Sequence, residues 1–186
     1  MNSPLQSYII DFLKYMQFMR NCSLLTIVAY KRVLGDYCDY VGAEPAIIDF
    51  NFSLLRQYIY YLAAEKKVAP ATSAQTIACF KSFGKYLFRN GVTKTNEASR
   101  LVSPKKPQTL VPFLSQNDLQ KQNVATSKKS LIQARRNLVL ELFYGSGLRL
   151  AEAHQIKWGD LNCQGMTVRV IGKGDKQRVV PIGLPA

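Results

Sequence analysis

Apolar residues in the first hundred positions recur every three or four residues, and this spacing places them on one face of an α-helix. Four such stripes follow one another: Ile9, Phe12, Leu13 and Met16; Ile27, Tyr30, Leu34, Tyr37 and Val41; Leu55, Ile59 and Leu62; Ile77, Phe80, Phe83 and Leu87. The segments between them are short. The sequence therefore predicts a bundle of four helices that bury their stripes against one another.

Capping residues mark the ends of these helices. Ser23 is a candidate N-cap of the second helix, and Gly42 follows it as a stop signal. In the fourth helix Thr72 and Gln75 have the spacing of a capping box, and the Asn-Gly pair at 90–91 ends the helix. The third helix has two candidate N-caps, Asn51 and Ser53.

Positive charge narrows the possibilities further. The 186 residues carry 25 Lys and Arg against 12 Asp and Glu, a net charge of +13, and residues 66–106 alone hold nine cations and one acid, Glu97. Such an excess points to a polyanionic partner, and nucleic acid is the commonest one in a chain without lipidation motifs. A ribosomal, membrane-surface or merely very soluble protein can share this balance.

Part of this charge forms a row on the fourth helix. Lys81, Lys85 and Arg89 are four residues apart, so they lie on one face beside the apolar stripe. A solvated outer face gives the same pattern, but the position of the row within the basic segment favours contacts with phosphates. The predicted nucleic-acid-binding residues are Lys81, Lys85, Arg89, Lys105 and Lys106.

Other patterns argue against a metal site and a membrane protein. The four cysteines, at positions 22, 38, 79 and 163, have no C-x-x-C spacing, and His154 is the only histidine. Reduced thiols and no metal are therefore expected. In the N-terminal residues 1–16 an acid, Asp11, and a lysine, Lys14, interrupt the apolar pattern, unlike in a signal peptide or a membrane span. We expect a cytoplasmic protein.

The composition changes after the helical segment. Residues 103–112, SPKKPQTLVP, contain three prolines and two lysines, which predicts an extended basic linker between a domain at 1–102 and another at 113–186. Ser115 and Asp118 resemble a capping pair that opens the second domain, and the apolar residues 131–144 predict a buried helix. The β-branched segments 166–171 and 177–182 predict a hairpin around a Gly-Lys-Gly turn.

One arginine stands in an unusual place. The apolar helix stops at Gly-Ser-Gly (145–147), and Arg149 follows at once, where we expect it to lie close to the core. Lys173 comes 24 residues later, at the tip of the predicted hairpin. A guanidinium that grips two phosphate oxygens and an ammonium that delivers a proton suit one substrate, the phosphodiester. Alternatively, Arg149 forms an i, i+3 ion pair with Glu152, and Lys173 is a surface turn residue.

These segments also resemble a known family. GSGLRLAEA, IKWGDLN and VRVIGKGDKQRVVPI are similar to the T-G-L-R-x-x-E-L and V-x-G-K-G-x-K-x-R-x-V-P segments of the tyrosine recombinases, in their phage-integrase and Xer-like branch. NCSLLTIVAYKRVLGDYCDYV and APATSAQTIACFKSFGKYLFRNG look like the second and fourth helices of the family's core-binding domain. Ser146 stands where the family usually has Thr, and Ala153 where it usually has Leu.

The resemblance implies a fold and a set of roles. It implies a mainly α chain, with a four-helix, SAM-like core-binding domain at 1–102 and the first part of a mixed α+β catalytic domain at 113–186. Arg149 would bind the scissile phosphate, Lys173 would protonate the leaving 5′ oxygen, and Glu152 would support Arg149. The implied activity is site-specific recombination of double-stranded DNA, without a cofactor or a membrane, by protomers that assemble as a tetramer.

Part of the family's catalytic set is absent from these 186 residues. The H-x-x-R segment, the second His or Trp and the tyrosine nucleophile have no counterpart after Lys173, and the last tyrosine is Tyr144. His154 and the residues to Lys157 imitate H-x-x-R only superficially, and we interpret His154 as a helix-surface residue. We therefore expect a truncated chain that binds DNA but does not cleave it alone. The alternatives are a non-catalytic DNA-binding module or regulator, and a basic scaffold or ribosome-associated protein. Family members serve chromosome-dimer resolution, phage integration, plasmid resolution and transposition, and these residues do not distinguish among the four roles.

Overall fold

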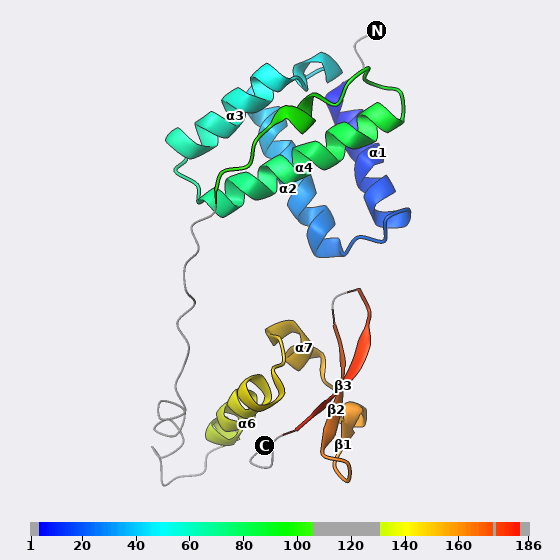
Figure 1. Cartoon of the computed structure of the whole chain (residues 1–186), viewed down its shortest axis with the longest axis vertical. Helices are drawn as coiled ribbons and strands as arrows, with labels where there is room; N and C mark the ends of the chain where they lie inside the picture. Colours follow the sequence, from blue (N-terminus) through cyan, green and yellow to red (C-terminus); the bar gives the residue numbers. More distant parts are fainter. Residues whose placement is uncertain (1–3, 106–130, 173, 183–186) are drawn as a thin grey trace. The chain divides into compact units, whose positions relative to one another are not determined.

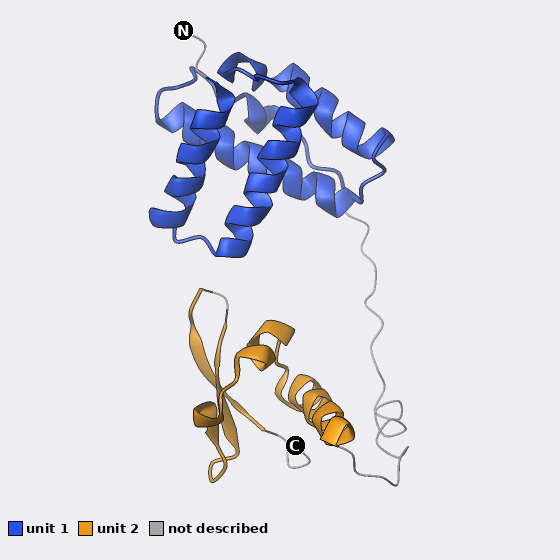
Figure 2. Ribbon diagram, turned by 180° about the vertical axis from the view of Figure 1, so that it is seen from behind, with its two compact units in different colours: residues 1–109 blue, residues 110–186 orange. Residues whose placement is uncertain are grey.

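The computed structural model describes residues 4–105, 131–172 and 174–182. The chain divides into two compact units, residues 1–109 and residues 110–186, which Figure 2 colours separately. The predicted capping pair Ser115 and Asp118, together with Lys106 and Lys173, lies outside the described residues. Among the described helices, none combines the length and the hydropathy that a bilayer span requires.

Unit 1 is the predicted four-helix bundle (Figure 1). Its helices are α1 (Leu5–Phe18), α2 (Leu24–Val41), α3 (Phe52–Ala64) and α4 (Pro70–Arg89), and its 3-10 turns are η1 (Ile47–Asp49) and η2 (Glu97–Arg100). Helix α4 contacts each of the other three helices and η2. The mainly α architecture expected from the apolar periodicity is therefore confirmed.

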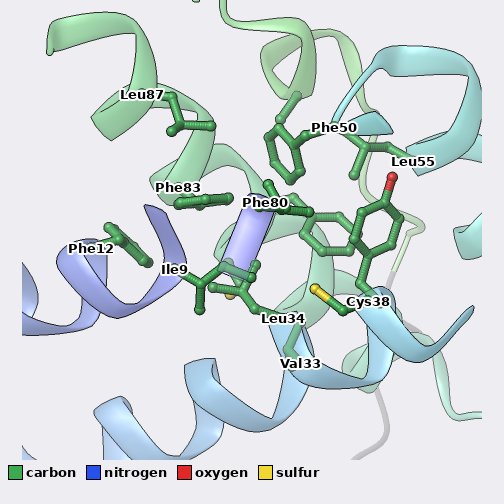
Figure 3. Close-up of a cluster of buried hydrophobic side chains, with 14 of the residues drawn as sticks. Ile9, Phe12, Val33, Leu34, Cys38, Phe50, Leu55, Phe80, Phe83 and Leu87 are labelled. Atoms are coloured by element: carbon green, nitrogen blue, oxygen red, sulfur yellow. The ribbon is translucent and has the colours of Figure 1, made fainter. Parts of the chain in front are cut away.

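Aromatic rings fill the centre of this bundle (Figure 3). Phe83 of α4 lies 5.2 Å from Phe12 of α1 and 4.9 Å from Phe50, measured between ring centroids. Phe80 lies 5.1 Å from Tyr37 of α2, whose hydroxyl donates a hydrogen bond to the carbonyl of Asp49 at 2.7 Å. Because Phe80 and Phe83 are fully buried, the core holds α4 in a fixed orientation and leaves its opposite face to solvent.

Of the expected N-caps, two are confirmed and one is wrong. The side chain of Ser23 accepts a hydrogen bond from the Thr26 amide at 3.4 Å, and Asn51, not Ser53, caps α3 by accepting from the Leu54 amide at 3.0 Å. The Thr72 capping box does not form, because α4 begins two residues earlier at Pro70. Proline is favoured at the first helical position, where no amide proton is needed, so the helix starts there without a side-chain cap.

Unit 2 is a small α+β unit. Its elements are α6 (Leu131–Ser146), α7 (Leu150–Gln155), η3 (Trp158–Asp160), β1 (Leu161–Asn162), β2 (Thr167–Ile171) and β3 (Gln177–Pro181). The strands pair antiparallel in the order β1-β2-β3, with Val168 opposite Val180 and Val170 opposite Arg178. The predicted hairpin is confirmed as β2 and β3, whereas the two-residue strand β1 was not expected.

The expectation of a buried helix before the Gly-Ser-Gly turn is wrong. No residue of α6 is buried, and the side chains of Leu131 and Ile132 are 91% and 81% exposed. The core of the described part of unit 2 consists of Leu148, Val168 and Val170, and only Leu142 and Phe143 of α6 pack against it. A helix of 16 residues is about 24 Å long, so this small core covers one end of it.

Candidate functional site

The turn between α6 and α7 sets the backbone of Arg149. Gly147 has φ +61°, in the left-handed region that glycine adopts without a steric penalty, and Leu148 after it is buried. The hydroxyl of Ser146 donates a hydrogen bond to the carbonyl of Pro181 at 2.8 Å, which ties the end of α6 to β3. Arg149 is consequently the N-cap residue of α7, in extended conformation.

A buried carboxylate organises the residues around Arg149. The side chain of Glu152 is 4% exposed. Its Oε2 accepts hydrogen bonds from the backbone amide of Arg149 at 2.9 Å and from Nη2 of Arg178 at 2.8 Å. Its Oε1 accepts from Nη1 of Arg149 at 3.0 Å and from Nη1 of Arg178 at 2.8 Å. Glu152 therefore joins the N-terminus of α7 to strand β3 through four hydrogen bonds.

These bonds keep the carboxylate ionised. The hydrogen bonds from Arg178, followed by that from the Arg149 amide, lower the pKa of Glu152 to about 2 against the opposing effect of burial. The hydrogen bonds to Glu152 in turn raise the pKa of Arg178. Two guanidinium groups face one carboxylate, so the cluster keeps an excess of positive charge at neutral pH.

The side chain of Arg149 does not lie in the core, contrary to expectation. It is 73% exposed, and the group that the core takes up is Glu152. An N-cap residue precedes the first helical turn, so its side chain can extend outward while its amide stays bound. The ion pair with Glu152, the structural alternative from the sequence, is present. The remaining guanidinium N–H groups of Arg149 have no protein partner within residues 4–105, 131–172 and 174–182, so they are available to an anion.

Arg178 is the residue of this cluster that the sequence did not predict. It is 26 residues from Glu152, so local spacing gives no hint of the pair. Strand alternation does give a signal: Arg178 and Val180 share the less exposed face of β3, and an arginine on such a face needs an anionic partner. Gly172, the residue before Lys173, packs against the pair, since a Cβ there would lie 3.0 Å from Nη1 of Arg178 and 3.3 Å from Oε1 of Glu152.

The single histidine lies on a helix surface. His154 is exposed on α7, which agrees with its interpretation as a helix-surface residue. Across the described residues, no three His, Cys, Asp or Glu side chains gather in a way that could hold a metal ion.

The basic row on α4 faces away from the core. Lys85 and Arg89 are exposed and Lys81 is partly exposed, on a helix whose opposite side carries the buried stripe. Lys105 is exposed after η2, and Lys106 lies outside the described residues. Within the part of the chain that the structure describes, no ion pair involves Lys81, Lys85 or Arg89. Their charge is therefore not neutralised by described neighbours.

Comparison with known proteins gives consistent matches. Residues 9–91 match the model described as "Phage integrase, N-terminal SAM-like domain", and residues 112–186 match that of the "Phage integrase family". The tyrosine recombinase XerC of Corynebacterium glutamicum is 33% identical over 184 residues, 97% of this chain and 58% of that protein. XerD of Vibrio cholerae is 30% identical over 182 residues, 97% of this chain and 60% of that protein.

Solved structures share the fold. A lambda integrase dimer bound to a COC' core site matches 97% of this chain and 49% of its own with a TM-score of 0.71 at 16% identity. The Tn1549 transposon integrase in complex with a circular intermediate DNA matches 96% and 62% with a TM-score of 0.70 at 13% identity. The chain spans about 60% of the length of the curated relatives that it matches. The two family models match the two units in sequence order, and the second match includes the Gly-Leu-Arg turn at 147–149 and the β2–β3 hairpin. The chain therefore belongs to the phage integrase family of tyrosine recombinases.

Proposed function

We propose that these residues belong to a site-specific recombinase that binds double-stranded DNA, cleaves it and rejoins it. The observation that carries this proposal is the exposed guanidinium of Arg149, tethered to a buried carboxylate and offering its remaining donors to solvent. In a member of the phage integrase family, the anion that fits this arrangement is a phosphodiester. Residues 1–102 would form the DNA-binding domain, 103–112 a linker, and 113–186 the first part of the catalytic domain.

Arg149 would act on the phosphate itself. A guanidinium presents parallel N–H groups that match two non-bridging oxygens, and its charge stabilises the phosphorane-like transition state. The tether matters because a donor that is already oriented needs no reorganisation when the charge develops. Lys173, which lies outside the described residues, would protonate the leaving 5′ oxygen, as the resemblance to the family implies.

Unit 1 would supply most of the affinity. Lys81, Lys85 and Arg89 follow one face of α4 at intervals of about 6 Å, from the helical rise of about 1.5 Å per residue. A row of cations without described ion-pair partners suits the phosphate backbone, and Lys105 and Lys106 would extend it. Contacts of this kind position a protein on DNA and carry no base specificity.

Further protomers are part of the proposal. One structure with the same fold is a lambda integrase tetramer bound to a Holliday junction, with a TM-score of 0.70. Rejoining strands from two duplexes requires more than one active site on the DNA, so we propose that copies of this recombinase assemble around paired sites.

The test uses the longest form of the protein that its gene encodes. Duplexes are first selected from a random pool by binding, and a selected site with a nick beside the scissile position is then incubated with the protein. We expect a covalent protein–DNA adduct through a tyrosine. Selective binding without any adduct would instead support the non-catalytic DNA-binding module, and the absence of binding would refute the proposal.

A further inference from the structure

We propose that Arg178 is a positioning residue, which acts through Glu152 to fix the direction in which Arg149 presents its guanidinium donors. This inference rests on the proposed role of Arg149 as a phosphate ligand. Arg178 does not touch the substrate in this scheme. Its contribution is the orientation of another side chain.

The hydrogen bonds of Glu152 show how such control works. A carboxylate has about four acceptor positions, and in Glu152 each is matched by one donor, two from Arg178 and two from Arg149. Arg178 contacts both oxygens at 2.8 Å, so the carboxylate cannot rotate about its terminal bond without breaking this bidentate pair. The Oε1 atom that receives Nη1 of Arg149 is thereby held in place.

The orientation of the Arg149 guanidinium depends on Oε1 of Glu152 more than that of a buried arginine would. The side chain of Arg149 is 73% exposed, and its one side-chain hydrogen bond to a described residue is that to Oε1 at 3.0 Å. A long side chain with a single tether changes direction when the tether moves. The backbone amide of Arg149 donates to Oε2 of the same carboxylate at 2.9 Å, so Glu152 sets both the start of α7 and the direction of the guanidinium.

Strand β3 and Gly172 make Arg178 a firm support. Arg178 lies opposite Val170 in the β2–β3 ladder, and Val170 is 2% exposed. A Cβ on Gly172 would come within 3.0 Å of Nη1 of Arg178, and the Gly172 amide donates to the carbonyl of Lys176 at 2.8 Å. The hairpin backbone thus confines the guanidinium of Arg178 on one side, and a methyl group at position 172 would press on it.

The neighbouring strand offers a matched control. Arg169 of β2 donates from Nε and Nη2 to Oδ1 of Asp160 at 3.1 and 2.8 Å. This is also an arginine–carboxylate pair of unit 2, but Asp160, in η3, has no described contact with Arg149. Replacing Arg169 by Lys perturbs a comparable ion pair without disturbing Glu152.

The first measurement needs no catalysis. In the 186-residue chain, the NMR signal of the Arg149 Nε–H group is assigned by its disappearance in Arg149→Lys. The chemical shift and heteronuclear NOE of this signal are then recorded in Arg178→Lys, Gly172→Ala and Arg169→Lys. We expect a shifted and more mobile signal in the first two variants and an unchanged signal in Arg169→Lys. An Arg149 signal unchanged in Arg178→Lys would overturn the inference, whatever Arg149 itself does. If Arg178→Lys unfolds unit 2, Gly172→Ala takes its place, and an unchanged Arg149 signal in Gly172→Ala would then overturn the inference.

The second measurement is single-turnover cleavage by the longest form that the gene encodes. We expect Arg178→Lys to lose about 10²-fold in cleavage rate, the usual cost of a misplaced catalytic group, at a temperature at which unit 2 of the variant remains folded. A variant that combines Arg178→Lys with Arg149→Lys should cleave no more slowly than Arg149→Lys alone, because the two substitutions remove the same function. Additive losses would overturn positioning, whereas parental cleavage by Arg149→Lys would refute the phosphate role of Arg149 instead.

Discussion

Glu152 of α7 and Arg178 of β3 are 26 residues apart in sequence and are joined by two hydrogen bonds of 2.8 Å. In the described part of unit 2 the buried apolar core consists of Leu148, Val168 and Val170. With so small a core, a bidentate ion pair to a carboxylate that is 4% exposed is a principal link between the helix and the hairpin. The same pair that supports the proposed catalytic arginine also supports the fold around it.

The stability of unit 2 should fall in acid because of Glu152. Its pKa is lowered from an ordinary value of 4.5 to about 2, mainly by the hydrogen bonds from Arg178. A group with a depressed folded-state pKa contributes fully above its unfolded value, and this contribution is lost as the pH falls from about 4.5 toward about 2. Urea unfolding, followed by NMR signals of β2 and β3 from pH 6 to pH 2.5, measures the loss. Glu152→Gln should be less stable at pH 6 and should lack this part of the pH dependence; equal slopes in the two proteins would contradict the assignment.

Two glycines in unit 1 should respond in opposite directions to the same substitution. A Cβ on Gly84 of α4 would collide with the side chain of Asn96 and come within 3.2 Å of the Cβ of Ala98, so Gly84→Ala should destabilise unit 1 by about 1–3 kcal/mol. Gly35 in α2 has no atom within 4 Å of that position, so Gly35→Ala should stabilise by about 0.5–1 kcal/mol through helix propensity. Chemical denaturation of both variants checks the pair. A stabilised Gly84→Ala would show that α4 does not pack on η2 as described.

Binding to DNA should depend steeply on salt, and part of this dependence should come from α4. Replacing Lys81, Lys85 and Arg89 together by Ala should weaken binding at least several-fold across unrelated duplexes. It should also reduce the slope of log K against log salt by about 2 to 3, since each phosphate contact contributes about 0.9. Fluorescence anisotropy at several salt concentrations measures both quantities. The control variant replaces Lys14, Arg20 and Arg56 by Ala, three cations that are exposed elsewhere on unit 1. An equal loss of DNA affinity in this control would mean that only the net charge of the protein matters.

The parts of the fold that the sequence predicts are those governed by local spacing. The stripe of Ile77, Phe80, Phe83 and Leu87 is buried as expected, and Ser23 caps α2, because helical periodicity and capping involve residues within one or two turns. The same local rule failed at Thr72, where Pro70 provided a competing start signal two residues earlier.

The candidate site was predicted only in part, because its main contacts are not local. Glu152 was expected beside Arg149 on helical spacing, and it is there. The exposure of Arg149 and the pairing of Arg178 depend on how β3 folds back onto α7, which no spacing rule encodes. The exposed α6 has the same origin: an apolar pattern predicts a helix, whereas burial requires neighbours that cover it.

The replacement of Arg149 by Lys separates a catalytic role from a structural one. The side chain is 73% exposed and its backbone amide, which binds Glu152, is unaffected by the change, so the melting temperature and DNA affinity should stay close to those of the parent. Cleavage in the longest encoded form should nevertheless fall by about 10²–10³-fold, the typical cost of losing one donor that stabilises the transition state. Lys keeps the positive charge but cannot reproduce the bidentate fork.

Melting temperature, affinity and cleavage are measured on one preparation, with Arg169→Lys as the control for a lost arginine fork. If stability, binding and cleavage declined together, Arg149 would be a structural partner of Glu152; parental cleavage by a stable variant would mean that the phosphate is held by another residue.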